Sequence, residues 1–170
     1  QDQGITFRTR SDTEVLIQAL AHWREQALDR LQGMFAFVFF AVPNKSLLVA
    51  RDRFGIKPLY IAEHGSGIAF ASEIKQLLDL PGVARRMNLA RVRDFLEFGI
   101  SDHTGETFFT GVRQLRGGEC LSFELTSSRP LDGVGPRRWY RLPVPGSLDL
   151  APEAASQRFP PRWSTVVSLP

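Results

Sequence analysis

The stretch Leu31-Gln32-Gly33-Met34-Phe35-Ala36-Phe37-Val38-Phe39-Phe40-Ala41-Val42 decides the fold. Its last nine residues, 34–42, are all apolar, and four of them are phenylalanine. A strand with one face in water would alternate apolar and polar positions, and this stretch does not. We therefore predict a strand at residues 34–42 that is covered on both faces, as in a sheet packed between two other layers.

A helix is predicted before this strand. Ser11 stands three residues before Glu14, the spacing of a capping box in which each side chain bonds to the other residue's backbone N–H. Gly33 is expected to end the segment. Residues 5–9 alternate and could form a short strand. Apolar residues recur at helical spacing after the cap, at Val15, Leu16, Ala19, Leu20, Trp23, Ala27, Leu28 and Leu31.

Two hairpins are predicted after Gly33. The turn at residues 43–46 joins the first strand to a second apolar strand at 47–50. The turn at 64–67 joins strands at 59–63 and 68–71.

Two more helices and one more strand follow. Ser72 can cap a helix at residues 73–80. Asn88 can cap another, which Gly99 would stop; its apolar side would be Val92, Phe95, Leu96 and Phe98. A strand is expected at 120–125. Helices beside doubly covered hairpins indicate an α+β layered sandwich.

The chain has 170 residues, a length that suits one globular domain. We place that domain at residues 1–142, with Trp139-Tyr140 closing it. Six of the eleven prolines fall in the last 28 residues, where apolar periodicity is lost. Residues 143–170 are therefore interpreted as a tail without a core of its own.

Composition excludes several classes of protein. The net charge is +3 and the arginines are scattered, whereas a nucleic-acid binder concentrates its basic residues on one face. No stretch approaches the roughly 20 apolar residues of a membrane span. The single cysteine excludes an internal disulfide and fits a reducing compartment, so we expect a cytoplasmic protein that binds neither membrane nor nucleic acid.

Several segments, in order along the chain, resemble the glutaminase domain of glutamine-dependent asparagine synthetases. The resemblance extends over about residues 5–142, and the ordered series is far more specific than any one motif. The segments are 11–16 (SDTEVL), 31–37 (LQGMFAF), 50–60 (ARDRFGIKPLY), 70–75 (FASEIK), 95–99 (FLEFG), 111–112 (GV) and 139–140 (WY).

This resemblance implies a four-layer α-β-β-α fold of the N-terminal-nucleophile type. It also implies hydrolysis of glutamine to glutamate and ammonia, with the ammonia passing to a C-terminal synthetase domain that activates aspartate. ATP and magnesium would belong to that second domain, and no cofactor or metal site is expected in this chain. A homodimer stays open, because the sequence does not decide the oligomeric state.

Of the residues that the chemistry requires, only Asp12 lies within this sequence. In the family, an N-terminal Cys attacks the amide and its α-amino group acts as the base, while an Asp binds the substrate's ammonium group. The matching position is Asp12, which we predict to bind glutamine. A carboxylate in a first helical turn also favours the helix dipole, and we expect both roles. The nucleophile, the arginine for the substrate carboxylate and the oxyanion-hole segment are expected before Gln1.

The motif at residues 51–58 is interpreted as architecture, with a turn at Gly55 and with Arg51 and Asp52 able to pair internally. A role in lining the route to the second domain is the alternative. Cys120 is rejected as a nucleophile, because its α-amino group is in a peptide bond and it lies in an expected strand. The histidines show no metal-ligand spacing.

We expect no catalytic residue in this chain, and the chain alone to hydrolyse no glutamine. Two alternatives stay open. One is a non-catalytic remnant or interaction module whose strand edges are exposed. The other is the glutaminase half of a different amidotransferase, such as glutamine phosphoribosylpyrophosphate amidotransferase or glucosamine-phosphate synthase.

Overall fold

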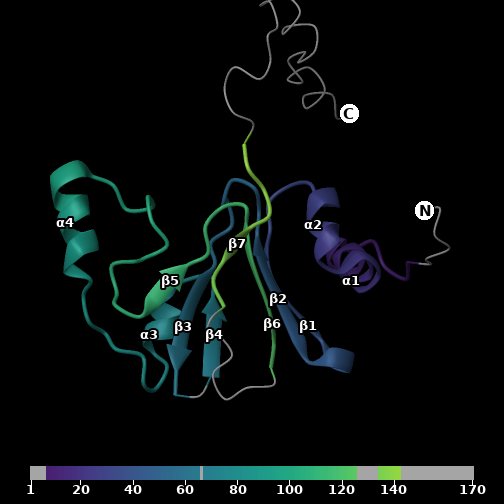
Figure 1. Cartoon of the computed structure of the whole chain (residues 1–170), viewed down its shortest axis with the longest axis horizontal. Coiled ribbons are helices and arrows are strands. Elements are labelled where there is room, and N and C mark those ends of the chain that lie inside the picture. Colours follow the sequence, from purple (N-terminus) through teal and green to yellow (C-terminus); the bar gives the residue numbers. More distant parts are fainter. Residues whose placement is uncertain (1–6, 66, 126–133, 143–170) are drawn as a thin grey trace, which may run out of the picture.

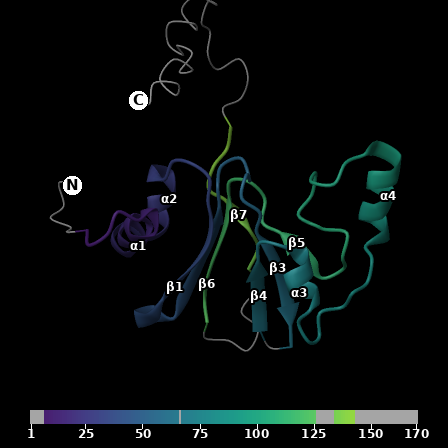
Figure 2. The same ribbon diagram turned by 180° about the vertical axis from the view of Figure 1, so that it is seen from behind.

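The computed structural model describes residues 7–65, 67–125 and 134–142. Within these residues the chain forms two antiparallel sheets that lie between helices (Figures 1 and 2). The predicted tail at 143–170 and most of the predicted strand at 5–9 lie outside the described residues, and residues 7–9 form no strand.

The first sheet has the strand order β1-β2-β6-β7 and the second has the order β4-β3-β5. Hairpins form β1 with β2 and β3 with β4, as predicted. The pairing of β2 with β6 and of β3 with β5 joins distant parts of the chain. The strands are β1 (Ala36–Ala41), β2 (Ser46–Arg51), β3 (Tyr60–His64), β4 (Gly67–Ala71), β5 (Val112–Gln114), β6 (Glu119–Glu124) and β7 (Arg137–Arg138).

Helices cover the outer faces of both sheets. Helices α1 (Asp12–Trp23) and α2 (Ala27–Arg30), joined by η1 (Arg24–Gln26), lie on the first sheet, and α3 (Ile74–Leu78) lies on the second (Figure 1). The predicted single helix is therefore broken after Trp23, where Arg24 has a positive φ of 49°. Residues Val42–Asn44 form the short η2 that connects β1 with β2.

Three apolar clusters mark the contacts between four layers. One fills the space between the sheets and includes Val49, Ile61 and Leu121. A second lies between the first sheet and α1 and α2, and the third between the second sheet and α3. The α+β, four-layer α-β-β-α fold is thus confirmed.

The prediction that residues 34–42 are covered on both faces is wrong. Strand β1 has only β2 as a neighbour among the described residues, and it lies at the edge of its sheet. Phe37 and Phe39 pack toward the helices, but Val38 and Phe40, on the opposite face, are 41% and 45% exposed. The doubly covered strand is β2, whose residues 47–50 are all buried.

Two helix predictions need correction. Glu73, not Ser72, is the N-cap of α3, and the backbone N–H of Glu73 donates to the Gln76 side chain (3.3 Å). Helix α4 (Leu89–Phe98) has the predicted ends at Asn88 and Gly99, and Gly99 adopts the left-handed conformation. However, α4 buries no residue, because it stands apart from the sheets and contacts mainly the 103–108 segment (Figure 1).

We predict that copies of the chain associate through the edge of strand β1. An unpaired strand edge beside exposed apolar side chains is a template for contact between copies. We expect the Phe40→Lys variant to show a lower average molecular mass than the wild-type chain when both are sedimented at roughly 10–100 μM protein. A charge on an edge strand opposes its pairing with a strand of another copy.

The matched control is Val15→Lys, which changes an equally exposed apolar residue on α1. A wild-type chain that sediments as a monomer, or an equal effect of Val15→Lys, would contradict this assignment of the contact to β1.

Candidate functional site

The predicted glutamine ligand, Asp12, is the first residue of α1. Ser11 is the N-cap, and its hydroxyl accepts a hydrogen bond from the Thr13 N–H (3.2 Å). The Asp12 carboxylate is exposed at the end of the helix where the macrodipole is positive. Its position is therefore fixed by the cap while its oxygens stay open to solvent.

Glu14 secures the chain before the helix, but not as a capping box predicts. Its carboxylate accepts from the backbone N–H groups of Arg8 (2.8 Å) and Thr9 (2.7 Å), not from Ser11. Residues 8–10 bend, which brings these earlier donors to the carboxylate. The bond from the Arg8 N–H, followed by that from the Thr9 hydroxyl, lowers the pKa of Glu14.

Asp12 lines neither of two large cavities. One, of about 880 Å³, lies beside residues 51–55, and the other, of about 740 Å³, lies beside η2. The assignment of Asp12 to the substrate ammonium rests on the resemblance and stays a prediction.

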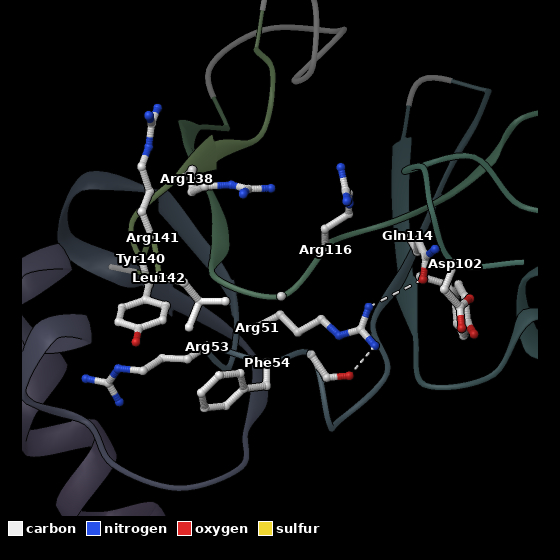
Figure 3. A pocket seen from close by; sticks show the side chains of 13 residues that line it. Arg51, Arg53, Phe54, Asp102, Gln114, Arg116, Arg138, Tyr140, Arg141 and Leu142 are labelled. Atoms are coloured by element: carbon white, nitrogen blue, oxygen red, sulfur yellow. Dashed lines mark hydrogen bonds between the residues drawn. The ribbon is translucent and has the colours of Figure 1, made fainter. Parts of the chain in front are cut away.

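The loop at residues 51–58 is built around the Arg51 side chain. Its guanidinium donates to the backbone carbonyls of Gly55, Lys57 and Leu115, each at 2.6 Å. The bond to Gly55 is drawn in Figure 3. Arg51 ends β2 in the first sheet, whereas Leu115 follows β5 in the second. One side chain therefore ties the loop to both sheets.

Asp52 holds the same loop from inside. Its side chain is 1% exposed and accepts from the backbone N–H groups of Phe54 (3.1 Å), Ile56 (3.0 Å) and Lys57 (2.9 Å). Burial alone would raise the pKa of Asp52, but the donated hydrogen bonds outweigh it and lower that pKa.

These contacts agree with the architectural interpretation of residues 51–58. They do not agree with the predicted ion pair between Arg51 and Asp52. Arg51 and Asp52 each bind backbone groups instead of one another. Gly55 has the predicted turn conformation, with φ of 68°. A methyl group on Gly117 would lie 2.7 Å from the Gly55 nitrogen, so Gly117 allows the β5–β6 turn to approach the loop.

Cys120 is buried in β6, and burial, with a smaller effect from Glu119, raises its pKa to about 11. Such a thiol stays protonated near neutral pH, which disfavours nucleophilic attack. In the described part of the chain, no three His, Cys, Asp or Glu side chains are grouped to hold a metal. No helix among the same residues is long and apolar enough to cross a membrane.

One feature of the 880 Å³ cavity was missed by the sequence analysis. Five arginines line it, at Arg51, Arg53, Arg116, Arg138 and Arg141 (Figure 3). They come from three separated segments, so no local run of basic residues signals their convergence.

The family follows from a comparison with known proteins. Residues 1–132 match the model of the glutamine amidotransferase domain family. The chain belongs to this family. It is 35% identical over 121 residues to asparagine synthetase 3 (glutamine-hydrolyzing) of Bacillus subtilis, covering 71% of this chain and 20% of that protein. It is 38% identical over 117 residues to a putative asparagine synthetase of Mycobacterium bovis, covering 68% and 18%.

The predicted resemblance to asparagine synthetases is thus confirmed. The chain spans about a fifth of the length of these curated relatives. A solved structure of the allosteric regulatory enzyme of purine biosynthesis is similar in fold, with a TM-score of 0.50 and 23% identity. That similarity covers 83% of this chain and 24% of the other.

The Asp52 contacts predict a pH-dependent contribution to stability. Because the folded-state pKa is lowered, this contribution is present above the unfolded-state pKa of about 3.9 and is lost as pH falls through the lower folded value. Asp52→Asn should lower the free energy of unfolding by about 2–3 kcal/mol at pH 7, measured by urea denaturation.

The difference from wild type should shrink below about pH 4. Asp29→Asn is the control, since Asp29 is exposed on α2 and its substitution should change stability by less than about 0.5 kcal/mol. Equal stability of wild type and Asp52→Asn at pH 7 would contradict the structural role of Asp52.

Proposed function

We propose that this chain forms part of the glutaminase domain of an asparagine synthetase. In the complete protein, glutamine would be hydrolysed to glutamate and ammonia, and the ammonia used for ATP-dependent amidation of aspartate. The 35% identity over 121 residues, combined with the α-β-β-α layers, carries this proposal. ATP and magnesium would act in the synthetase domain, and we assign no described residue of this chain to either.

Asp12 would bind the ammonium group of glutamine. Its carboxylate is exposed and its backbone is held by the Ser11 cap and by the bonds of Glu14 to residues 8 and 9. A carboxylate on a backbone held in this way can form a charge-assisted hydrogen bond with the ammonium group.

The chain by itself would be inactive. Hydrolysis by this family's mechanism needs a Cys whose own α-amino group acts as base. The single cysteine, Cys120, is peptide-bonded, buried, and has a pKa raised to about 11. Losing a nucleophile in another hydrolase costs on the order of 10⁶ in rate.

We therefore expect the purified chain to release no glutamate from glutamine above the rate without protein, measured with a coupled glutamate assay. Turnover by the wild-type chain that persists in Cys120→Ala would reveal another nucleophile and contradict this expectation. Turnover that disappears in Cys120→Ala would contradict the rejection of Cys120.

Asp12 is tested in a complete enzyme. A chimera would carry residues 7–142 in place of the matching segment of the Bacillus subtilis relative. Asp12→Asn should lower kcat/KM for glutamine roughly 10- to 100-fold, because a charged hydrogen bond to the substrate is lost. Asparagine formation from added ammonia should persist, since that route bypasses glutamine.

Asp29→Asn in the same chimera is the control and should leave both routes unchanged. An Asp12→Asn variant with wild-type kcat/KM for glutamine would remove Asp12 from the substrate site. A chimera that makes asparagine from ammonia but never from glutamine would instead count against the glutaminase assignment.

A second candidate function is that of an interaction module. The exposed edge of β1 and the uncovered apolar side of α4, with Phe95 51%, Leu96 77% and Phe98 68% exposed, favour it. The synthetase domain or a second copy of the chain would be the partner. If the chimera makes asparagine from glutamine, the enzymatic role is favoured over that of an interaction module.

A further inference from the structure

The arginine cavity is the 880 Å³ cavity lined by Arg51, Arg53, Arg116, Arg138 and Arg141. Figure 3 shows that the five arginines come from the start of the 51–58 loop, from the β5–β6 turn and from β7 and the residues after it. Among the described residues, Asp102 is its single acidic lining residue. The described part of the lining therefore carries five arginines and one carboxylate.

Five of the ten other arginines in the described residues form ion pairs with carboxylates, and five (Arg8, Arg10, Arg24, Arg30 and Arg86) do not. Four of the paired arginines have a carboxylate partner at an N···O distance of 3.3 Å or less, and the fifth, Arg137, pairs with Glu25. The four are Arg85–Asp79 (2.6 Å), Arg91–Asp94 (3.0 Å), Arg93–Glu97 (2.8 Å) and Arg113–Glu63 (3.3 Å).

The cavity arginines converge on one space, and their contacts differ from those of the five paired arginines. Arg51 and Arg53 donate to backbone carbonyls, which hold their position without cancelling their charge. Among the described carboxylates, Arg138 has only a long contact of 3.7 Å with Glu119. Across residues 7–65, 67–125 and 134–142, the side chains of Arg116 and Arg141 have no carboxylate within salt-bridge distance.

Concentrated positive charge of this kind favours an anion. Like charges around one partly enclosed space repel, and a bound anion reverses that interaction. Two of the guanidinium groups are already oriented: Arg51 by three carbonyls, and Arg53 by two carbonyls and the rings of Trp139 and Tyr140, at 5.4 and 5.3 Å. Less side-chain freedom is therefore lost when a ligand enters.

We propose that the arginine cavity binds a small anion carrying two or more phosphate groups. The planar guanidinium fork matches phosphate oxygens and bonds them in pairs. The arginines come from three segments, so a ligand that reaches several of them needs more than one anionic group. The volume falls within the range of ordinary small-molecule sites, roughly 300–1,000 Å³. Asp12 does not line this cavity.

The test is titration calorimetry of the whole chain with inorganic pyrophosphate. The variant Arg116→Ala/Arg141→Ala should bind pyrophosphate at least roughly tenfold more weakly, because two charge-assisted contacts are lost. The control Arg85→Ala/Arg93→Ala removes the same net charge from paired arginines outside the cavity. The affinity of this control for pyrophosphate should stay within about twofold of that of wild type, since the charges that line the cavity are unchanged.

Urea denaturation checks that both variants fold, because Arg116 is half-buried whereas Arg85, Arg93 and Arg141 are exposed. Arg116→Lys/Arg141→Lys keeps the charge but loses the forks, and should bind with intermediate affinity. Three results would overturn the proposal: no heat from wild type with pyrophosphate, equal loss in the control variant, or tighter binding of tetraglutamate than of pyrophosphate. The last would mark the cavity as a site for an acidic polypeptide.

Discussion

The structure depends on the contacts of one dipeptide, Arg51-Asp52, with the backbone around it. Arg51 binds carbonyls on its own loop and at Leu115, while Asp52 binds three N–H groups of the loop and its backbone carbonyl accepts from Gly118 (2.8 Å). These bonds join the end of β2 to the β5–β6 turn. The two sheets therefore meet at a point fixed by polar groups, although apolar residues fill the space between them.

The same contacts create the arginine cavity. Arg53 follows the buried Asp52, and its guanidinium carbon lies 5.4 Å from the ring centre of Trp139 and 5.3 Å from that of Tyr140. Gly117 has no side chain, which lets the β5–β6 turn approach the loop and brings Arg116 to the rim. An arrangement that is structural in origin thus places several positive charges around one space.

Local sequence signals predicted the features that depend on neighbouring residues. The Ser11 cap, the two hairpins and both ends of α4 need only residues close in sequence, and all were predicted. Burial was predicted less well, because it depends on distant partners. The apolar run at 34–42 and the apolar side of α4 have the sequence pattern of buried elements. Val38, Phe40 and Leu96 are nevertheless exposed.

The candidate site residues show the same difference between features that depend on neighbouring residues and features that depend on distant ones. Asp12 was predicted from a contiguous motif, and the same motif predicted the Ser11 cap. The predicted capping box does not form, because Ser11 accepts from the Thr13 N–H and Glu14 accepts from residues 8 and 9. The arginine cavity could not be found, since its residues are separated by up to 90 positions and converge only when β6 pairs with β2 and β7 pairs with β6. In this glutamine amidotransferase domain, the residue predicted to bind substrate lies on a local motif. The proposed anion site, by contrast, depends on the pairing of distant strands, and only the folded chain reveals it.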